Sequence, residues 1–150
     1  MIALLQRVTT ARVEVDGVDV ARIGPGLAVL VGVLPEDREA DAEALLTRVL
    51  AYRIFGDESD RMNRSLTDTQ GGLLLVPQFT LAADTRKGLR PGFSGAAPPA
   101  QGKRLFEHLA AFAVQSHATV ACGVFGAHMR LSLTNDGPAT FWLEHPARPG

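Results

Sequence analysis

The chain is poor in the residues that mark several common classes of protein. Cysteine occurs once in 150 residues, at Cys122, which excludes an internal disulfide and favours a reducing compartment. Cys122 lies in an apolar run without a cationic or histidine neighbour, so we expect a buried core thiol. No apolar run approaches the ~20 residues of a membrane-spanning helix, and the N-terminus has no signal-peptide pattern. These absences predict a cytoplasmic protein with no membrane partner.

Sequence motifs for metals and nucleotide cofactors are also missing. The pair Gly71-Gly72 lacks the Lys-Ser/Thr that completes a phosphate-binding P-loop, and no dinucleotide fingerprint is present. None of the histidines stands at metal-ligand spacing from a cysteine or a carboxylate, so surface or structural roles are expected for them. They are His108, His117, His128 and His145. We therefore predict neither a metal nor a cofactor.

An excess of charge of one sign is lacking too. The 15 Lys and Arg residues nearly balance the 16 Asp and Glu residues, and the formal net charge is −1. Proteins that grip long nucleic acid backbones carry a broad basic surface. We expect no DNA partner.

The composition is otherwise typical of one folded domain. Hydrophobic residues make up 46% of the chain and charged residues 21%, so disorder is not expected. A chain of this length buries roughly 70% of its extended surface on folding. We expect residues 1–150 to form a single domain.

Apolar periodicity predicts an α+β fold. Strand and turn signals predict an opening hairpin over residues 2–23 around Asp16-Gly17, and the continuous apolar run 27–34 predicts a central strand buried on both faces. Helical spacing predicts one helix from an N-cap at Asp37 to about Ile54. A second helix is expected around residues 105–113, with Pro98 or Pro99 in its first turn.

The remaining elements are shorter. Residues 56–72 are expected to form a loop or a short irregular hairpin. Further strands are expected from residue 73 and around residues 119–125, 129–134 and 140–144. This order of strands and helices favours mixed strand pairing over a series of βαβ units.

Two short segments place polar residues where apolar runs end. The first is Pro77-Gln78-Phe79-Thr80-Leu81, and the second is Asn-Asp-Gly-Pro-Ala-Thr at residues 135–140. The X-Pro bond is the one peptide bond for which cis costs little, and glycine permits close approach, so Gly137-Pro138 can direct its carbonyls unusually. Taken alone, a Gly-Pro step is better explained as a plain turn that closes a hairpin.

Together the two segments resemble the signature motifs of the D-aminoacyl-tRNA deacylases (D-tyrosyl-tRNA(Tyr) deacylase family), Ser-Gln-Phe-Thr-Leu and Asn-X-Gly-Pro-Val-Thr. Residues 1–8, 52–55, 79–85 and 137–144 are also similar to that family in order and spacing, which covers essentially the whole chain. The resemblance implies a homodimer of barrel-like mixed sheets, each covered by two main helices, with active sites at the subunit interface. It also implies a hydrolase that removes D-amino acids from the charged 3′ end of tRNA, a proofreading reaction in translation.

The resemblance assigns roles to residues of the first segment. Gln78 and Thr80 line the pocket, while the main-chain N–H groups of Phe79 and Thr80 face the ester carbonyl. The ribose 2′-hydroxyl of the terminal adenosine assists the attack. No histidine or lysine is adjacent to Thr80 in the sequence, which disfavours a covalent mechanism. An activated ester needs a positioned water and a stabilised oxyanion more than a strong base.

The second segment is implied to select the substrate. Gly137-Pro138, in the cis form, would reach across the dimer and exclude L-residues sterically, so D-residues and glycine, including glycine mischarged on tRNA-Ala, would be accepted. Arg7 is either an ordinary strand arginine or, as the resemblance implies and we favour, stands near the partner's Gly-Pro. Phe125 and Met129 are core residues by pattern, whereas the resemblance puts them near the adenine.

Two positions depart from the motifs. Pro77 replaces a serine, with loss of a hydroxyl and an N–H, and Ala139 replaces a valine. A sister group that removes L-alanine from mischarged tRNA is similar and carries proline at the first position, but Phe79 and Arg7 agree with the D-specific enzymes. Two alternatives stay open: a deacylase that prefers L-alanine mischarged on tRNA, and a non-catalytic dimeric binding module.

A small basic cluster follows the first segment. Arg86, Lys87 and Arg90 either contact phosphates of a tRNA acceptor end or belong to a solvated loop. The two interpretations are equally favoured by the sequence.

Overall fold

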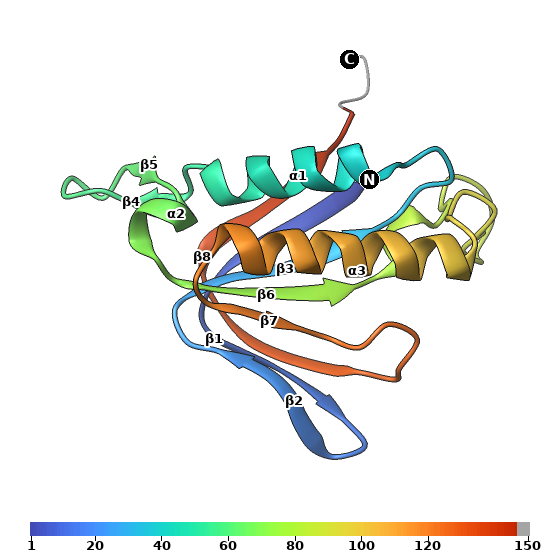
Figure 1. Ribbon diagram of the computed structural model, residues 1–150, viewed down its shortest axis with the longest axis horizontal. Coiled ribbons are helices and arrows are strands. Elements are labelled where there is room, and N and C mark those ends of the chain that lie inside the picture. The colour runs from blue at the N-terminus through green and yellow to red at the C-terminus, as the bar shows by residue number, and fades with distance from the viewer. Residues whose placement is uncertain (147–150) are drawn as a thin grey trace.

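A strongly curved sheet with two helices on one side forms the body of the molecule (Figure 1). The computed structural model describes residues 1–146. Within them, six strands form one mixed sheet in the order β2-β1-β3-β6-β7, and β8 pairs with the other edge of β1. The strands are β1 (Ile2–Val15), β2 (Val18–Ile23), β3 (Gly26–Gly32), β6 (Gly72–Pro77), β7 (Val120–Cys122) and β8 (Arg130–Glu144). The pairs β3–β6 and β6–β7 are parallel and the others antiparallel, which confirms the α+β class with a mixed, nearly closed barrel-like sheet.

The opening hairpin is confirmed, with one change. β1 is a single strand of 14 residues that pairs with β3 through its first half and with β2 through its second half. Asp16 and Gly17 have φ values of 51° and 77°, and two successive positive φ values are typical of the tight turns that suit a twisted hairpin.

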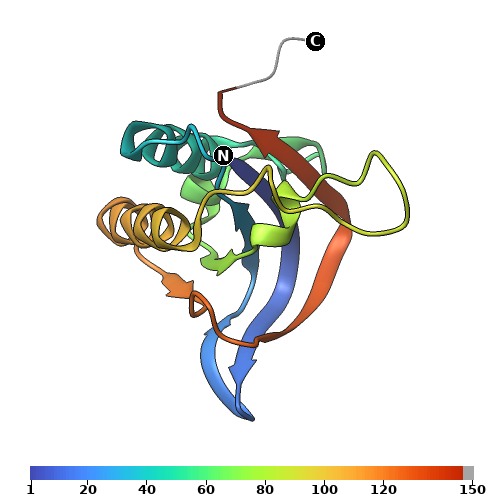
Figure 2. The same ribbon diagram turned by 90° about the vertical axis from the view of Figure 1, so that its right-hand side faces the viewer.

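The two main helices, α1 (Glu39–Ala51) and α3 (Pro99–Ser116), cover the same side of the sheet, as Figure 2 shows. α3 begins as predicted, with Pro98 as N-cap and Pro99 as the first helical residue. The predicted N-cap of α1 at Asp37 is wrong, because Arg38 holds that position. The buried Asp37 carboxylate instead binds the Met1 amino group at 2.8 Å and the Leu34 N–H at 2.7 Å.

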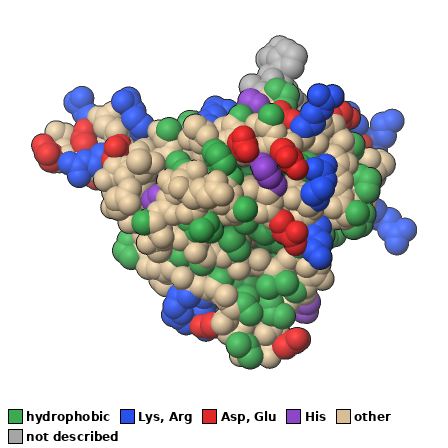
Figure 3. Space-filling view, viewed as in Figure 1, with side chains coloured by type: hydrophobic (Ala, Val, Ile, Leu, Met, Phe, Trp, Pro, Cys, Tyr) green, Lys and Arg blue, Asp and Glu red, His purple; other side chains and the backbone are tan. Residues whose placement is uncertain are grey.

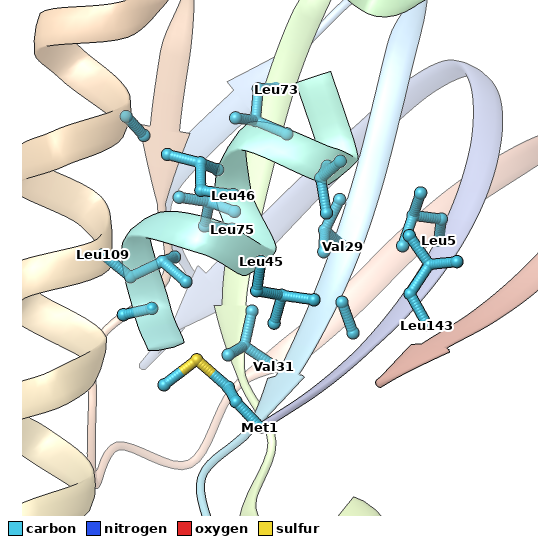
Figure 4. Close-up of a cluster of buried hydrophobic side chains, with 14 of the residues drawn as sticks. Met1, Leu5, Val29, Val31, Leu45, Leu46, Leu73, Leu75, Leu109 and Leu143 are labelled. Atoms are coloured by element: carbon cyan, nitrogen blue, oxygen red, sulfur yellow. The ribbon is translucent and has the colours of Figure 1, made fainter. Parts of the chain in front are cut away.

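Strands β3 and β6 are buried on both faces, as their continuous apolar sequences predict. Alternate side chains of a strand point to opposite faces. Leu27, Val29 and Val31 of β3 pack under the helices, while Ala28 faces a second cluster inside the curve of the sheet. Figure 4 shows the first cluster, in which Met1, directly before β1, meets residues of β1, β6, β8, α1 and α3, namely Leu5, Leu45, Leu46, Leu73, Leu75, Leu109 and Leu143.

The segment after α1 contains the predicted irregular hairpin and a helical turn that was not predicted. β4 (Phe55–Gly56) pairs with β5 (Met62–Arg64), and α2 (Leu66–Thr69) follows. α2 is held by a reciprocal cap, in which the Ser65 hydroxyl accepts from the Asp68 N–H and the Asp68 carboxylate accepts from the Ser65 N–H.

The C-terminal strands also differ from the prediction. β7 covers only three residues, and the two strands expected at 129–134 and 140–144 are parts of one strand, β8. They join because β1 is long enough to pair with both parts. Among the described residues, no helix is long and apolar enough to cross a membrane.

Candidate active site

The first polar segment, residues 77–81, lies where β6 ends and the short helix η1 (Phe79–Ala82) begins. The Gln78 N–H donates to the Val31 carbonyl of β3 at 2.7 Å, so the nitrogen of the preceding Pro77 faces β7. β7 ends at Cys122, and Gly123 makes the last bond, to the Leu75 carbonyl at 2.8 Å. Pro77 therefore ends the β6–β7 ladder, because its nitrogen carries no hydrogen to donate.

At this turn the chain presents polar groups to the outside. Phe79 is 58% exposed, and the Thr80 side chain is exposed as well. The Gln78 amide donates a hydrogen bond to the Thr80 hydroxyl oxygen. Within residues 1–146, the N–H groups of Phe79 and Thr80 make no hydrogen bond, whereas the next N–H, that of Leu81, donates to the Gln78 carbonyl. Two adjacent donors are thus free to bind an oxygen atom.

A cavity of about 550 Å³ opens beside this turn. Its lining is mainly apolar, and His128 is the one titratable residue in the wall among the described residues. Gly102 lets α3 lie close to the Phe125 ring, because a Cβ at this position would stand 3.3 Å from the ring. The wall includes Pro77, Gln78, Phe79, Phe93, Phe125 and Met129. Such a cavity suits an uncharged, planar group.

The second polar segment forms a bulge within β8. Gln6 of β1 pairs with Thr140 and Val8 pairs with Asn135, so residues 136–139 of β8 loop out opposite Arg7. The Gly137-Pro138 bond is cis, and both residues are exposed. The interpretation as a plain hairpin turn is wrong, because the strand continues along β1 on both sides of the bulge.

Two side chains hold the bulge in shape. The Asn135 amide donates to the carbonyls of Arg7 (2.9 Å) and Ala139 (3.1 Å), and a Cβ on Gly137 would overlap the Asn135 side-chain oxygen. Arg7 donates to the carbonyls of Asp136 (2.8 Å) and Ile54 (2.7 Å). Arg7 thus binds the bulge of its own chain.

The predicted site residues fall into two groups. Pro77, Gln78, Phe79, Phe125 and Met129 line the cavity, and Thr80 contacts Gln78. Arg7, Gly137 and Pro138 lie together at the bulge, and none of these three lines the cavity within the described chain.

Two residues near the site were not predicted. Phe93 packs its ring against Phe79 with 5.3 Å between centroids, but it lies in a Gly/Pro-rich loop where no local pattern marks it. Asn135 stands in the second motif, which by itself assigns it no role, although an Asn before a turn commonly bonds nearby backbone groups.

Apart from His128 in the cavity wall, the titratable groups near the site in the described chain supply no obvious base. Cys122 is half-buried rather than fully buried, and burial raises the pKa of its thiol, which is therefore protonated at neutral pH. The buried His117 bonds the Gly71 carbonyl at 2.6 Å, and His108 lies 3.0 Å from Glu43. Within residues 1–146, no three His, Cys, Asp or Glu side chains are grouped to hold a metal ion.

The chain matches known proteins over nearly its full length. The family described as D-Tyr-tRNA(Tyr) deacylase matches residues 4–144. The chain belongs to this family. A protein named D-aminoacyl-tRNA deacylase from Thioalkalivibrio sulfidiphilus is 62% identical over 146 residues, which are 97% of this chain and 98% of the relative.

Solved structures agree with the family's fold. The structure titled c-Myc DNA Unwinding Element Binding Protein superposes with a TM-score of 0.93 at 37% identity, over 98% of this chain and 100% of that one. A structure titled as a probable eukaryotic D-amino acid tRNA deacylase gives a TM-score of 0.81 at 20% identity, over 95% and 97% of the two chains. The second likeness concerns the fold alone.

Proposed function

We propose that the protein is a cytoplasmic D-aminoacyl-tRNA deacylase of one domain, which hydrolyses the ester bond and releases D-amino acid and tRNA. Membership of the D-Tyr-tRNA(Tyr) deacylase family is the observation that carries this proposal. The cavity beside Gln78, with its apolar wall and two free N–H groups at its edge, suits the terminal adenosine and the ester of such a substrate.

The chemistry rests on main-chain groups. The N–H groups of Phe79 and Thr80 stabilise the oxyanion that forms when water attacks the ester, and preorganised donors of this kind need no reorganisation during the reaction. The Gln78 amide holds the Thr80 hydroxyl through a hydrogen bond, but an amide takes up no proton. The role of Thr80 is therefore to orient the groups of the site, and its hydroxyl does not attack the ester. Phe125 and Met129 contact the adenine, and Pro77 completes the wall beneath it.

We propose that substrate selection needs two copies of the chain. The sheet face that lacks helices carries an apolar patch of Leu4, Leu30 and Trp142, which are neighbours across strands β3, β1 and β8. Trp142 is 49% exposed there, and Leu30 pairs with Val76, two residues before Gln78. A second copy on this patch would bring its Gly-Pro bulge to the cavity, where the carbonyls would exclude the side chain of an L-residue. Arg7 and Asn135 keep the bulge in shape.

Release of labelled amino acid from D-tyrosyl-, L-tyrosyl-, glycyl- and L-alanyl-tRNA tests the proposal. We expect the D-tyrosyl and glycyl esters to be hydrolysed and both L-esters to be spared, because glycine has no side chain to exclude. Preferential loss of the L-alanyl ester would indicate the sister activity, and no turnover of any ester would indicate a binding module.

A further inference from the structure

The loop of residues 84–92, which projects from the molecule after η1, is a basic surface next to the cavity (Figure 2). It is closed at its base by two hydrogen bonds, Asp84 N–H to the Gly92 carbonyl (2.7 Å) and Gly92 N–H to the Asp84 carbonyl (2.9 Å). It carries three cations and one carboxylate, on a chain of net charge −1. Lys and Arg side chains stand out at the right-hand edge of Figure 3, where Figure 1 draws this loop.

The cations of the loop are not equivalent. The Arg86 guanidinium donates to both carboxylate oxygens of Asp84, each at 2.9 Å, and this pairing holds the pKa of Asp84 well below its usual range. Arg86 is thus engaged at neutral pH. Lys87 and Arg90 are exposed and form no ion pair with any of residues 1–146.

The loop is joined to the site through an aromatic contact. Phe93, directly after the loop, packs on Phe79 and lines the cavity. Among the described residues, the cavity wall carries no Lys or Arg, so a nucleic acid whose last base enters the cavity can bind cations only outside it. Arg130 follows Met129 of the cavity wall but does not itself line the cavity, and it is the register partner of Glu14, whose carboxylate pairs with Arg12 at 2.9 Å.

We infer that Lys87 and Arg90 bind backbone phosphates of the single-stranded 3′ end of the tRNA, on the 5′ side of the terminal nucleotide. The inference rests on the proposed function, whose terminal adenosine occupies the cavity. Arg86 shapes the loop through Asp84 and makes no phosphate contact. The contact is electrostatic and independent of base sequence, and it supplies affinity rather than chemistry.

The test compares two substrates of the full-length protein, D-tyrosyl-tRNA and 3′-O-D-tyrosyl-adenosine, which has no phosphate. In Lys87→Gln/Arg90→Gln we expect KM for the tRNA to rise roughly tenfold with kcat unchanged, and the salt dependence of kcat/KM to weaken by about 0.7 per lost contact. Hydrolysis of the adenosine ester should be unchanged. Two control variants should keep the wild-type salt dependence. Arg12→Gln/Arg22→Gln removes equal charge from the β1–β2 hairpin, and Leu89→Ala alters the loop without changing its charge.

Two results would overturn the inference: an equal loss on both substrates, or an unchanged KM and salt dependence for the tRNA. If the wild type hydrolyses neither ester, the proposed function is rejected, but the inference about the loop is not. Binding of uncharged tRNA, titrated with salt, then decides the inference, which is rejected if the double variant binds as tightly as the wild type.

Discussion

At the scale of single residues, the proposed site depends more on main-chain N–H groups than on strong acids or bases. Gln78, Phe79 and Thr80 bring two free N–H groups, one amide and one hydroxyl to the edge of the cavity. An aminoacyl ester is activated, so groups that stabilise the oxyanion and place the water are sufficient for its hydrolysis.

Thr80→Ala tests this division of roles. Because the hydroxyl is bonded to an amide and has no base, we expect kcat/KM for D-tyrosyl-tRNA to fall by no more than roughly tenfold, whereas loss of a true nucleophile costs about a millionfold. Rapid-quench measurements give the rate. Detection by mass spectrometry of a D-tyrosyl adduct on Thr80 in the wild type would refute the non-covalent mechanism.

At the scale of elements, α3 supports the cavity and the core together. Its Gly102 and Phe106 line the cavity, while Leu105 and Leu109 are packed against the sheet and are at most 1% exposed. A loss of packing beneath α3 therefore affects both stability and the shape of the site.

Leu105→Ala is expected to lower the free energy of unfolding by about 2–5 kcal/mol, because the side chain is fully buried and leaves a cavity. Urea denaturation followed by circular dichroism measures the change. Val114→Ala on the same helix is the matched control, since Val114 is 64% exposed and should change stability by less than about 0.5 kcal/mol. Equal effects of the two substitutions would contradict this packing of α3.

At the scale of the whole molecule, the described chain keeps the cavity and the Gly-Pro bulge apart. The bulge is on β8, at the far edge of β1 from β3 and β6. In the proposed dimer, two copies would bring them together through the patch of Leu4, Leu30 and Trp142. Oligomeric state and substrate selection are then linked.

If the proposed dimer forms through this patch, Trp142→Asp is expected to convert it to a monomer and to abolish discrimination between D- and L-tyrosyl-tRNA, because a desolvated carboxylate opposes association. Sedimentation velocity gives the mass. Trp142 is the only tryptophan, so the wild type should also show a red shift of emission on dilution. Exposed Val18, on the β1–β2 hairpin, provides the control substitution Val18→Asp. A monomeric wild type that discriminates fully would contradict the composite site.

The sequence by itself determined the local elements and the two motifs. Continuous apolar runs predicted β3 and β6, since a strand buried on both faces has no polar side. Helical spacing predicted α1 and α3, and the order of residues 77–81 and 135–140 pointed to the family that residues 4–144 match. These features depend on neighbours in the chain, which the sequence shows directly.

Only the tertiary structure decided how these pieces meet. The union of two predicted strands into β8 depends on the length of β1, and the role of Asp37 depends on Met1 and Leu34. The contact of Phe93 with Phe79 likewise has no local pattern. Contacts between distant residues arise from packing of the whole chain, because burial and pairing are satisfied jointly and not residue by residue.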